Sequence, residues 1–230
     1  TIALISVGTG NDWIRMYGLP TRYAAVIRAI KEGYTFLQDV AAMEYEESRY
    51  RQTRYMANVA GVGFDAAVIK RGQMMNGNDK KKKGAGFYIR ALINTFFRYK
   101  PTGVKIWVND RLMYNNLLFS LAAGVGKYNG GGIQQLPQSV ADDGLLDITL
   151  IKPLHWWHVI FRLRRLFNGE IYSIGHVQHL QGSKIRIESS PEIDLEIDGE
   201  LHGGTPIELR VLHRAVKVIV NKSFIDKLKA

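Results

Sequence analysis

Cysteine is absent from this chain of 230 residues. The absence excludes disulfides and thiolate catalysis, and it fits a cytosolic protein. Uninterrupted apolar runs are also short, because none reaches about 18 residues, the length of a membrane-spanning helix. No secretory signal is visible, and the first residue is Thr1 rather than methionine. Since the chain begins within an apparent strand, we expect a further N-terminal part to precede it.

The composition is that of a globular protein with a basic surface. Hydrophobic residues make up 46% and charged residues 23% of the chain, and the formal net charge is +10. A basic surface attracts polyanions such as nucleic acid, nucleotide phosphates or an anionic membrane face. Part of the charge is clustered at Lys80–Lys83 and at Arg162, Arg164 and Arg165. Each run taken alone is typical of a solvated loop or helix face.

Hydrophobic patterning divides the chain into two unequal parts. The first forty residues have βαβ character, with an apolar strand at Ile2–Val7 and a helix from Pro20 to Gly33. From Tyr50 onwards short strands dominate, and their spacing predicts antiparallel sheets packed as a sandwich. Inserted helices are expected at 66–75, 86–99 and 153–167. We therefore predict an α/β part over residues 1–44, joined by 221–230, and a β-sandwich over 45–220, with the boundary near 41–48.

The first candidate site lies where the opening strand ends, at Gly8-Thr9-Gly10-Asn11-Asp12. Glycines let a backbone approach an anion, and Asp12 could hold magnesium directly or through water. The residues that follow read as a helix, whose N-terminus favours phosphate. The segment reads equally well as an ordinary strand-to-helix turn capped by Asn11 or Asp12.

Two later segments also combine glycines with acids. Gly130–Gly132 precedes Ala141-Asp142-Asp143-Gly144-Leu145-Leu146-Asp147, a pattern that suits close backbone approach and a hard cation. In Glu196-Ile197-Asp198-Gly199-Glu200 the carboxylates alternate with apolar residues, so one could face a cleft and accept a proton. Taken locally, the first segment reads better as a turn between strands and the second as a surface hairpin.

In their order and spacing these segments resemble the diacylglycerol kinase-like lipid kinases, a superfamily that includes bacterial lipid kinases, sphingosine kinases and ceramide kinases. The resemblance covers essentially the whole chain. The motifs that carry it are Gly8–Asp12, Asp39, Gly61-Val62-Gly63-Phe64-Asp65, Gly130–Gly132 with Asp143–Asp147, and Asp198-Gly199-Glu200.

The resemblance implies an enzyme related in fold to NAD kinases, in which ATP donates its γ-phosphate to a lipid hydroxyl. It implies that Asp12 and Asp39 organise the catalytic magnesium through water, that Glu200 is the general base, and that Asp198 is a second catalytic residue. It also implies a second, structural magnesium site. The implied nucleotide-site residues are Thr9, Gly10, Asn11, Asp12, Arg15 and Asp39, and the implied metal ligands are the Asp143 carboxylate and the carbonyls of Val140 and Leu145.

One element of the family pattern does not occur here, namely the phosphate loop Gly-Gly-Asp-Gly-Thr, which we expect upstream of residue 1. We therefore expect this chain alone not to turn over ATP. The expected partners are ATP, Mg²⁺, a lipid substrate at an anionic membrane surface and, as in related enzymes, a second copy in a homodimer. Lys80–Lys83 and the helix at 86–99 form the candidate docking element of a cytoplasmic, peripherally membrane-associated protein.

Three other functions are compatible with the residues. The net charge permits a nucleic-acid-binding module, although the sequence contains no recognised nucleic-acid motif, so this partner is disfavoured. A NAD kinase-like enzyme would differ in its acceptor. A non-catalytic relative would keep the fold but not the acids, whereas Asp12, Asp39 and Glu200 are all present.

Overall fold

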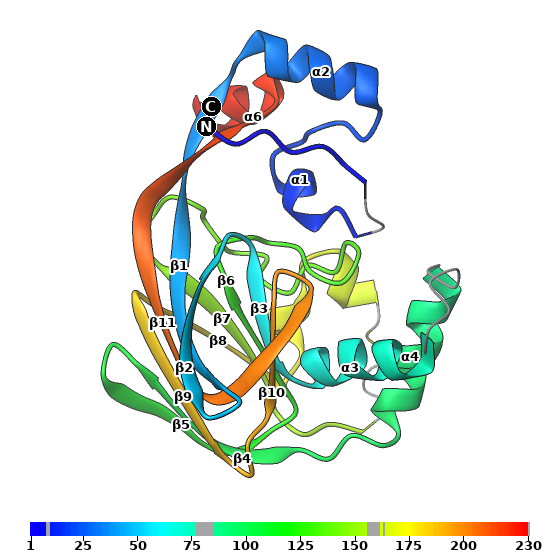
Figure 1. Cartoon of the computed structure of the whole chain (residues 1–230), viewed down its shortest axis with the longest axis vertical. Coiled ribbons are helices and arrows are strands. Elements are labelled where there is room, and N and C mark those ends of the chain that lie inside the picture. The colour runs from blue at the N-terminus through cyan, green and yellow to red at the C-terminus, as the bar shows by residue number, and fades with distance from the viewer. Residues whose placement is uncertain (8–9, 77–84, 156–161, 163, 230) are drawn as a thin grey trace.

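The computed structural model describes residues 1–7, 10–76, 85–155, 162 and 164–229 (Figure 1). A large β-sheet forms most of the molecule, and a small helical lobe that includes both termini lies at one end of it. The expected combination of α/β and mainly antiparallel β structure is confirmed. No helix in the described ranges is long and apolar enough to cross a membrane.

The described strands form one continuous eleven-stranded sheet rather than two separate sheets. Nine strands follow the order β5-β4-β9-β11-β10-β3-β6-β7-β8, and β1 joins this path by pairing with β11 and β2. All of these strand pairs are antiparallel. Their bounds are β1 Thr35–Glu47, β2 Tyr50–Met56, β3 Val59–Gly63, β4 Thr102–Val108, β5 Arg111–Leu118, β6 Ser120–Gly124, β7 Leu146–Ile151, β8 Val177–Gly182, β9 Lys184–Ser190, β10 Asp194–Ile197 and β11 Glu200–Ile219.

The sheet curls around one apolar core to which nearly every strand contributes. In β4 the side chains of Val104, Ile106 and Val108 are buried, whereas Lys105 and Trp107 between them are exposed and half-buried. This is the two-residue period of a half-buried strand. Strands β3 and β6 are buried over their whole length, because loops and a helix cover their second face.

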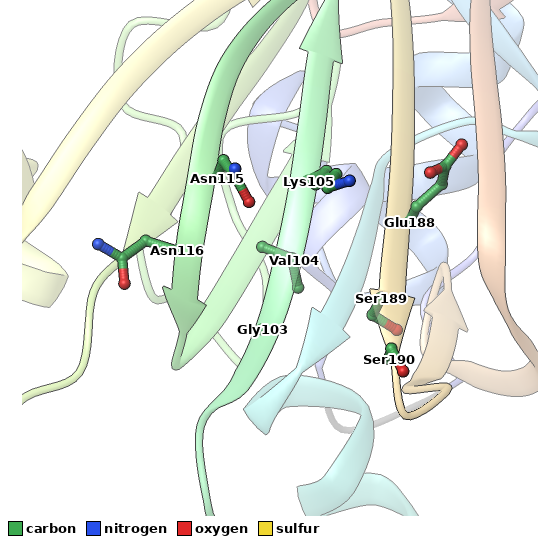
Figure 2. Close-up of a pocket in the computed structure, with 8 residues that line it drawn as sticks. All are labelled: Gly103, Val104, Lys105, Asn115, Asn116, Glu188, Ser189 and Ser190. Atoms are coloured by element: carbon green, nitrogen blue, oxygen red, sulfur yellow. The ribbon is translucent and has the colours of Figure 1, made fainter.

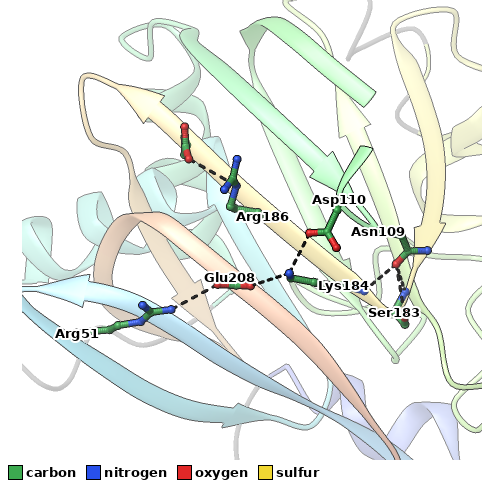
Figure 3. A network of polar contacts seen from close by, with 8 residues as sticks. Arg51, Asn109, Asp110, Ser183, Lys184, Arg186 and Glu208 are labelled. Atoms are coloured by element: carbon green, nitrogen blue, oxygen red, sulfur yellow. Dashed lines mark hydrogen bonds and ion pairs between the residues drawn. The ribbon is translucent and has the colours of Figure 1, made fainter. Parts of the chain in front are cut away.

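Ion pairs cover part of the outward face of the sheet (Figure 3). Lys184 Nζ lies 2.9 Å from Asp110 Oδ1 and 3.4 Å from Glu208 Oε1. The Arg51 guanidinium also contacts Glu208, and Arg186 stacks over Trp107 at 4.0 Å from the ring centroid. Such exposed pairs stabilise a fold by at most about 1 kcal/mol each.

The small lobe is built from α1 (Asp12–Met16), α2 (Tyr23–Glu32) and α6 (Lys222–Lys229). Its core combines residues from both ends of the chain, because Tyr17, Phe36 and Phe224 meet with ring centroids 5.1 to 6.0 Å apart. Strands β1 and β11 run on from this lobe into the large sheet (Figure 1). The predicted boundary at residue 44 therefore falls inside an unbroken strand.

Helices α3 (Phe64–Asn76) and α4 (Ala85–Phe96) pack together beside the sheet. Phe64, Phe96, Tyr99 and Phe119 form an aromatic cluster there, with Phe64 stacked on Phe119 at 4.6 Å.

One expectation from the sequence was wrong. Ile2–Val7 is not a buried strand, because only Ile2 forms a bridge, to Val218, while Ile5 and Val7 are 52% and 84% exposed. The described strands after residue 50 are mostly short, as expected, but β11 runs unbroken from Glu200 to Ile219. The boundary near 41–48 stays a prediction, and the β1–β2 hairpin extends through it. Residues 156–161 and 163 of the helix expected at 153–167 lie outside the described residues.

Candidate functional site

Asp12 connects the small lobe to a glycine loop of the large sheet. Its Oδ2 accepts a hydrogen bond from the Gly131 N–H at 2.8 Å, and its Oδ1 is buried with no hydrogen-bond partner. Burial raises the pKa of Asp12, although the Gly131 and Gly132 N–H groups and the charge of Arg15 act to lower it. A buried oxygen without a partner is where a cation or an ordered water would be stabilised.

The run Gly130–Gly132 is explained by its backbone conformation, because all three residues have positive φ, between 64° and 105°. A Cβ on Gly132 would lie 3.3 Å from the guanidinium carbon of Arg15, whereas a Cβ on Gly131 would meet no atom within 4 Å. Close approach therefore adds to the need for glycine at Gly132 but not at Gly131.

The other first-site residues surround Asp12. Arg15 Nε lies 3.9 Å from Asp12 Oδ1, and its guanidinium is 5.9 Å from the centre of the Tyr128 ring. Asn11 precedes α1 in a left-handed conformation with φ 55°. A Cβ on Gly10 would lie 3.4 Å from Asp12 Oδ2. Thr9 lies outside the described residues.

Asp39 is buried in a bulge, where Gln38 pairs with Val216 and Val40 pairs with Leu212. Both of its carboxylate oxygens are engaged. Oδ2 accepts from the Gly144 N–H at 2.7 Å, and Oδ1 accepts from the Arg214 N–H at 2.6 Å and lies 2.9 Å from His213 Nδ1. Asp39 therefore fixes the loop around Gly144 to the strands that link the two lobes.

That loop carries the expected second metal site. Asp143 is exposed, and its Oδ1 accepts from the Leu145 N–H at 2.9 Å. Val140 is 47% exposed. Within the described ranges no three His, Asp or Glu side chains gather as metal ligands would. A site made of one carboxylate and two backbone carbonyls has no such cluster, so the Asp143 site stays a prediction.

Asp198 has a structural role in the described chain. Its Oδ1 accepts from the N–H groups of Asn58 and Val59 at 2.9 and 3.1 Å, and its Oδ2 accepts from the Ala57 N–H at 2.8 Å. These bonds fasten the β10–β11 turn to the start of β3. The same short segment also bonds to β1, because the Ala57 carbonyl accepts a hydrogen bond from the Gln38 amide.

Glu200 begins β11 at the far side of that turn and is exposed. Asn58 supports the loop that reaches Asp12, because its carbonyl accepts from the Val125 and Gly126 N–H groups and its side-chain amide donates to Tyr128. The turn that presents Glu200 and the loop that contacts Asp12 are thus both hydrogen-bonded to one segment, Ala57–Val59.

Sequence reasoning missed the residues that link the turn of Glu200 to the loop that contacts Asp12. Asn58 carried no signal, because an asparagine between two strands reads as a turn. Gln135 links the loop to α3 by donating to Asp65 Oδ2 at 3.0 Å. Glu196, by contrast, belongs to a segment singled out from the sequence, and its signal is a charged residue between the buried Leu195 and Ile197.

A shallow polar hollow lies elsewhere, on strands β4, β5 and β9 (Figure 2). None of the residues predicted from the sequence as site residues lines it. Its lining residues are Gly103, Val104, Lys105, Asn115, Asn116, Glu188, Ser189 and Ser190.

Comparison with known proteins gives the family. Residues 58–220 match the YegS C-terminal NAD kinase beta sandwich-like domain. This chain belongs to that family, the diacylglycerol kinase-like lipid kinases.

Individual relatives are distant but cover nearly the whole chain. A diacylglycerol kinase of Mycobacterium tuberculosis is 24% identical over 95% of this chain and 68% of its own length. One of Bacillus subtilis is 24% identical over 99% of this chain and 72% of its own length. Among solved structures, a putative diacylglycerol kinase from Bacillus anthracis superposes with a TM-score of 0.73 at 24% identity, over 97% of this chain and 70% of that one.

Proposed function

We propose that this chain is part of an ATP- and magnesium-dependent lipid kinase that transfers the γ-phosphate of ATP to a hydroxyl group of diacylglycerol or a related lipid. The family and the names of its relatives support a lipid kinase. The observation that carries the proposal is the hydrogen bond between Asp12 and Gly131. It joins Asp12, an implied nucleotide-site residue, to the loop that is linked through Ala57–Val59 to the turn of Glu200, the implied general base.

The residues present fit magnesium at Asp12 better than at Asp39. Asp12 Oδ1 is buried without a hydrogen-bond partner, at 3.9 Å from Arg15 Nε, so it can hold a cation directly or through water. Both Asp39 oxygens already accept hydrogen bonds within the chain, so in this proposal Asp39 fixes the Gly144 loop and would act on magnesium only through water. Magnesium, when bound, would neutralise charge on the phosphates of ATP.

The acceptor side of the proposal rests on Glu200. Its carboxylate is exposed at the turn that Asp198 fastens to β3, so a lipid hydroxyl can reach it. A carboxylate there would accept the hydroxyl proton as the oxygen attacks phosphorus. Arg15 supplies positive charge on the nucleotide side, whereas the Gly130 and Gly131 N–H groups already donate to Asn129 Oδ1 and Asp12 Oδ2.

The lipid would be reached from a membrane surface that α4 contacts. Ile93 and Phe97 are 51% and 70% exposed at the end of this helix. Arg90, Arg98 and Lys100 beside them are also exposed. Apolar side chains flanked by cations suit an anionic bilayer surface. The predicted basic run Lys80–Lys83 lies outside the described residues.

The test is phosphate transfer from labelled ATP to a panel of lipids in mixed micelles, using the protein expressed from its complete natural reading frame. We expect Glu200→Gln to lower kcat at least about 100-fold, the usual contribution of a general base. Glu188→Gln, a matched change on the outward face of β9, should leave kcat unchanged. No labelled lipid, or full activity of Glu200→Gln, would contradict the proposal. The 230-residue chain alone should give no turnover.

A further inference from the structure

Glu196 is a buried carboxyl group that the proposed mechanism does not use. It is 1% exposed and lies on β10 opposite Gly61 of β3. Its Oε1 accepts a hydrogen bond from the Gly199 N–H at 2.5 Å, while its Oε2 is buried with no hydrogen-bond partner. Burying an ionised carboxylate without a full set of partners costs free energy, so the presence of a glutamate at position 196 needs an explanation.

A second carboxyl group, that of Asp65 at the start of α3, occupies the same space. A Cβ on Gly61 would lie 2.5 Å from Glu196 Oε2, 2.8 Å from Asp65 Cβ and 3.5 Å from Asp65 Oδ2. Only a glycine at position 61 leaves room for both side chains. Two carboxyl groups so close in a buried place cannot both ionise easily.

The charged groups around the pair favour a neutral Glu196. Those facing it in the described chain are Asp65 and Asp198, both acidic. Lys70 is engaged by Asp194, two residues along the strand, at 2.8 Å, and Tyr99 lies near Asp65. Burial first, and then these negative charges, raise the pKa of Glu196 to about 8, against the Gly199 N–H and Asn129. Burial raises the pKa of Asp65 to about 6.

We propose that Glu196 is a positioning residue, whose neutral carboxyl group beside Asp65 holds the Gly199 N–H and thereby orients the turn that presents Glu200. This inference rests on the proposed function, because it assigns Glu196 a role through the general base of that reaction. Ionisation makes Glu196 a stronger acceptor for the Gly199 N–H, but it also places a negative charge in a buried site next to Asp65 and Asp198. Because the pKa of Glu196 is raised to about 8, burial and this repulsion outweigh the stronger bond, so ionisation favours an opened turn in which Glu196 is solvated.

One experiment needs no catalysis. Amide hydrogen exchange of Gly199 is measured in the 230-residue chain from pH 6 to pH 9 and corrected for the intrinsic pH dependence of exchange. We expect the protection of Gly199 to fall by up to about tenfold per pH unit from pH 6 to about 8, because only the opened turn has an ionised Glu196 in that range, and to level off above about pH 8. In Glu196→Gln, which stays neutral and keeps a carbonyl acceptor, protection should not change with pH. If the protection of Gly199 does not change with pH in the unsubstituted chain, or falls equally in Glu196→Gln, the proposal is overturned.

A second experiment follows kcat against pH in the protein from the complete reading frame. The unsubstituted enzyme should lose activity as pH rises from 7 to about 8, whereas Glu196→Gln should retain it, with similar kcat at pH 7. Glu188→Gln is the control and should keep the alkaline loss. Identical profiles for the unsubstituted enzyme and Glu196→Gln would contradict a positioning role. If no lipid is phosphorylated at all, the proposed function fails, while the exchange experiment still decides the role of Glu196.

Discussion

The three hydrogen bonds that Asp198 accepts predict a large loss of stability when its side chain is removed. The substitution Asp198→Gly is the cleanest test, because Asp198 has φ 49° and glycine adopts this left-handed conformation without strain. The change removes one carboxylate and leaves the N–H groups of Ala57, Asn58 and Val59 without this acceptor.

The magnitude follows from the number and exposure of these bonds. A hydrogen bond to a charged group contributes about 1.5 to 3 kcal/mol. The bond to Ala57 is exposed and the other two are partly buried, so water can replace part of what is lost. We therefore expect Asp198→Gly to lower the free energy of unfolding by about 3 kcal/mol in urea titrations of the 230-residue chain.

Asp110→Gly is a matched control. Asp110 also lies in a two-residue hairpin turn with φ 62°, but its side chain is 78% exposed and pairs only with Lys184. Its loss should cost under about 1 kcal/mol. Equal effects of the two substitutions, or a loss below about 1 kcal/mol for Asp198→Gly, would refute the structural role of Asp198. A catalytic role alone would lower activity without this loss of stability.

Three further measurements test other parts of the structure. Gly61→Ala should lower the free energy of unfolding by about 1 to 3 kcal/mol through overpacking, because the new Cβ would lie 2.5 Å from Glu196 Oε2. Gly103→Ala is the control, since Gly103 has open space around it, and it should be neutral in the same urea titration of the 230-residue chain. Between Glu196's ordinary pKa of 4.5 and its folded value of about 8, the folded chain holds a proton that the unfolded chain has lost. Stability should therefore fall as pH rises through this window, by at most about 1.4 kcal/mol per pH unit, and Glu196→Gln should flatten that slope; an unchanged slope would be the contrary result. Replacing Lys80–Lys83 with glutamine should weaken sedimentation with anionic vesicles at low salt but not with zwitterionic ones, and unchanged binding would count against membrane docking.

Much of the site was predictable from local sequence. Gly130–Gly132 and Asp12 were chosen because glycines and short polar side chains after strands suit close approach to an anion, and the structure brings them into contact. The fold class followed from the spacing of short apolar runs, since alternation along a strand depends only on nearby residues. The amphipathic helix at 86–99 was placed within a few residues of its observed bounds for the same reason.

Other features depend on residues far apart in the chain. Ile2–Val7 has the composition of a buried strand, yet only Ile2 has a strand partner, and no local pattern reveals which partners exist. The role of Asp39 in organising magnesium through water stays a prediction. No local pattern reveals that its oxygens contact Gly144, His213 and Arg214, of which the nearest is more than one hundred residues away.

The sequence by itself determined the family, the strand-rich fold class and the acids that belong to the motifs, because these depend on residue type and spacing along the chain. Only the tertiary structure decided which acids are engaged, which are exposed and which share one space. Burial and neighbouring charge set the protonation of Glu196 and Asp65, and both arise from strand pairing and helix packing between segments that are distant in the sequence.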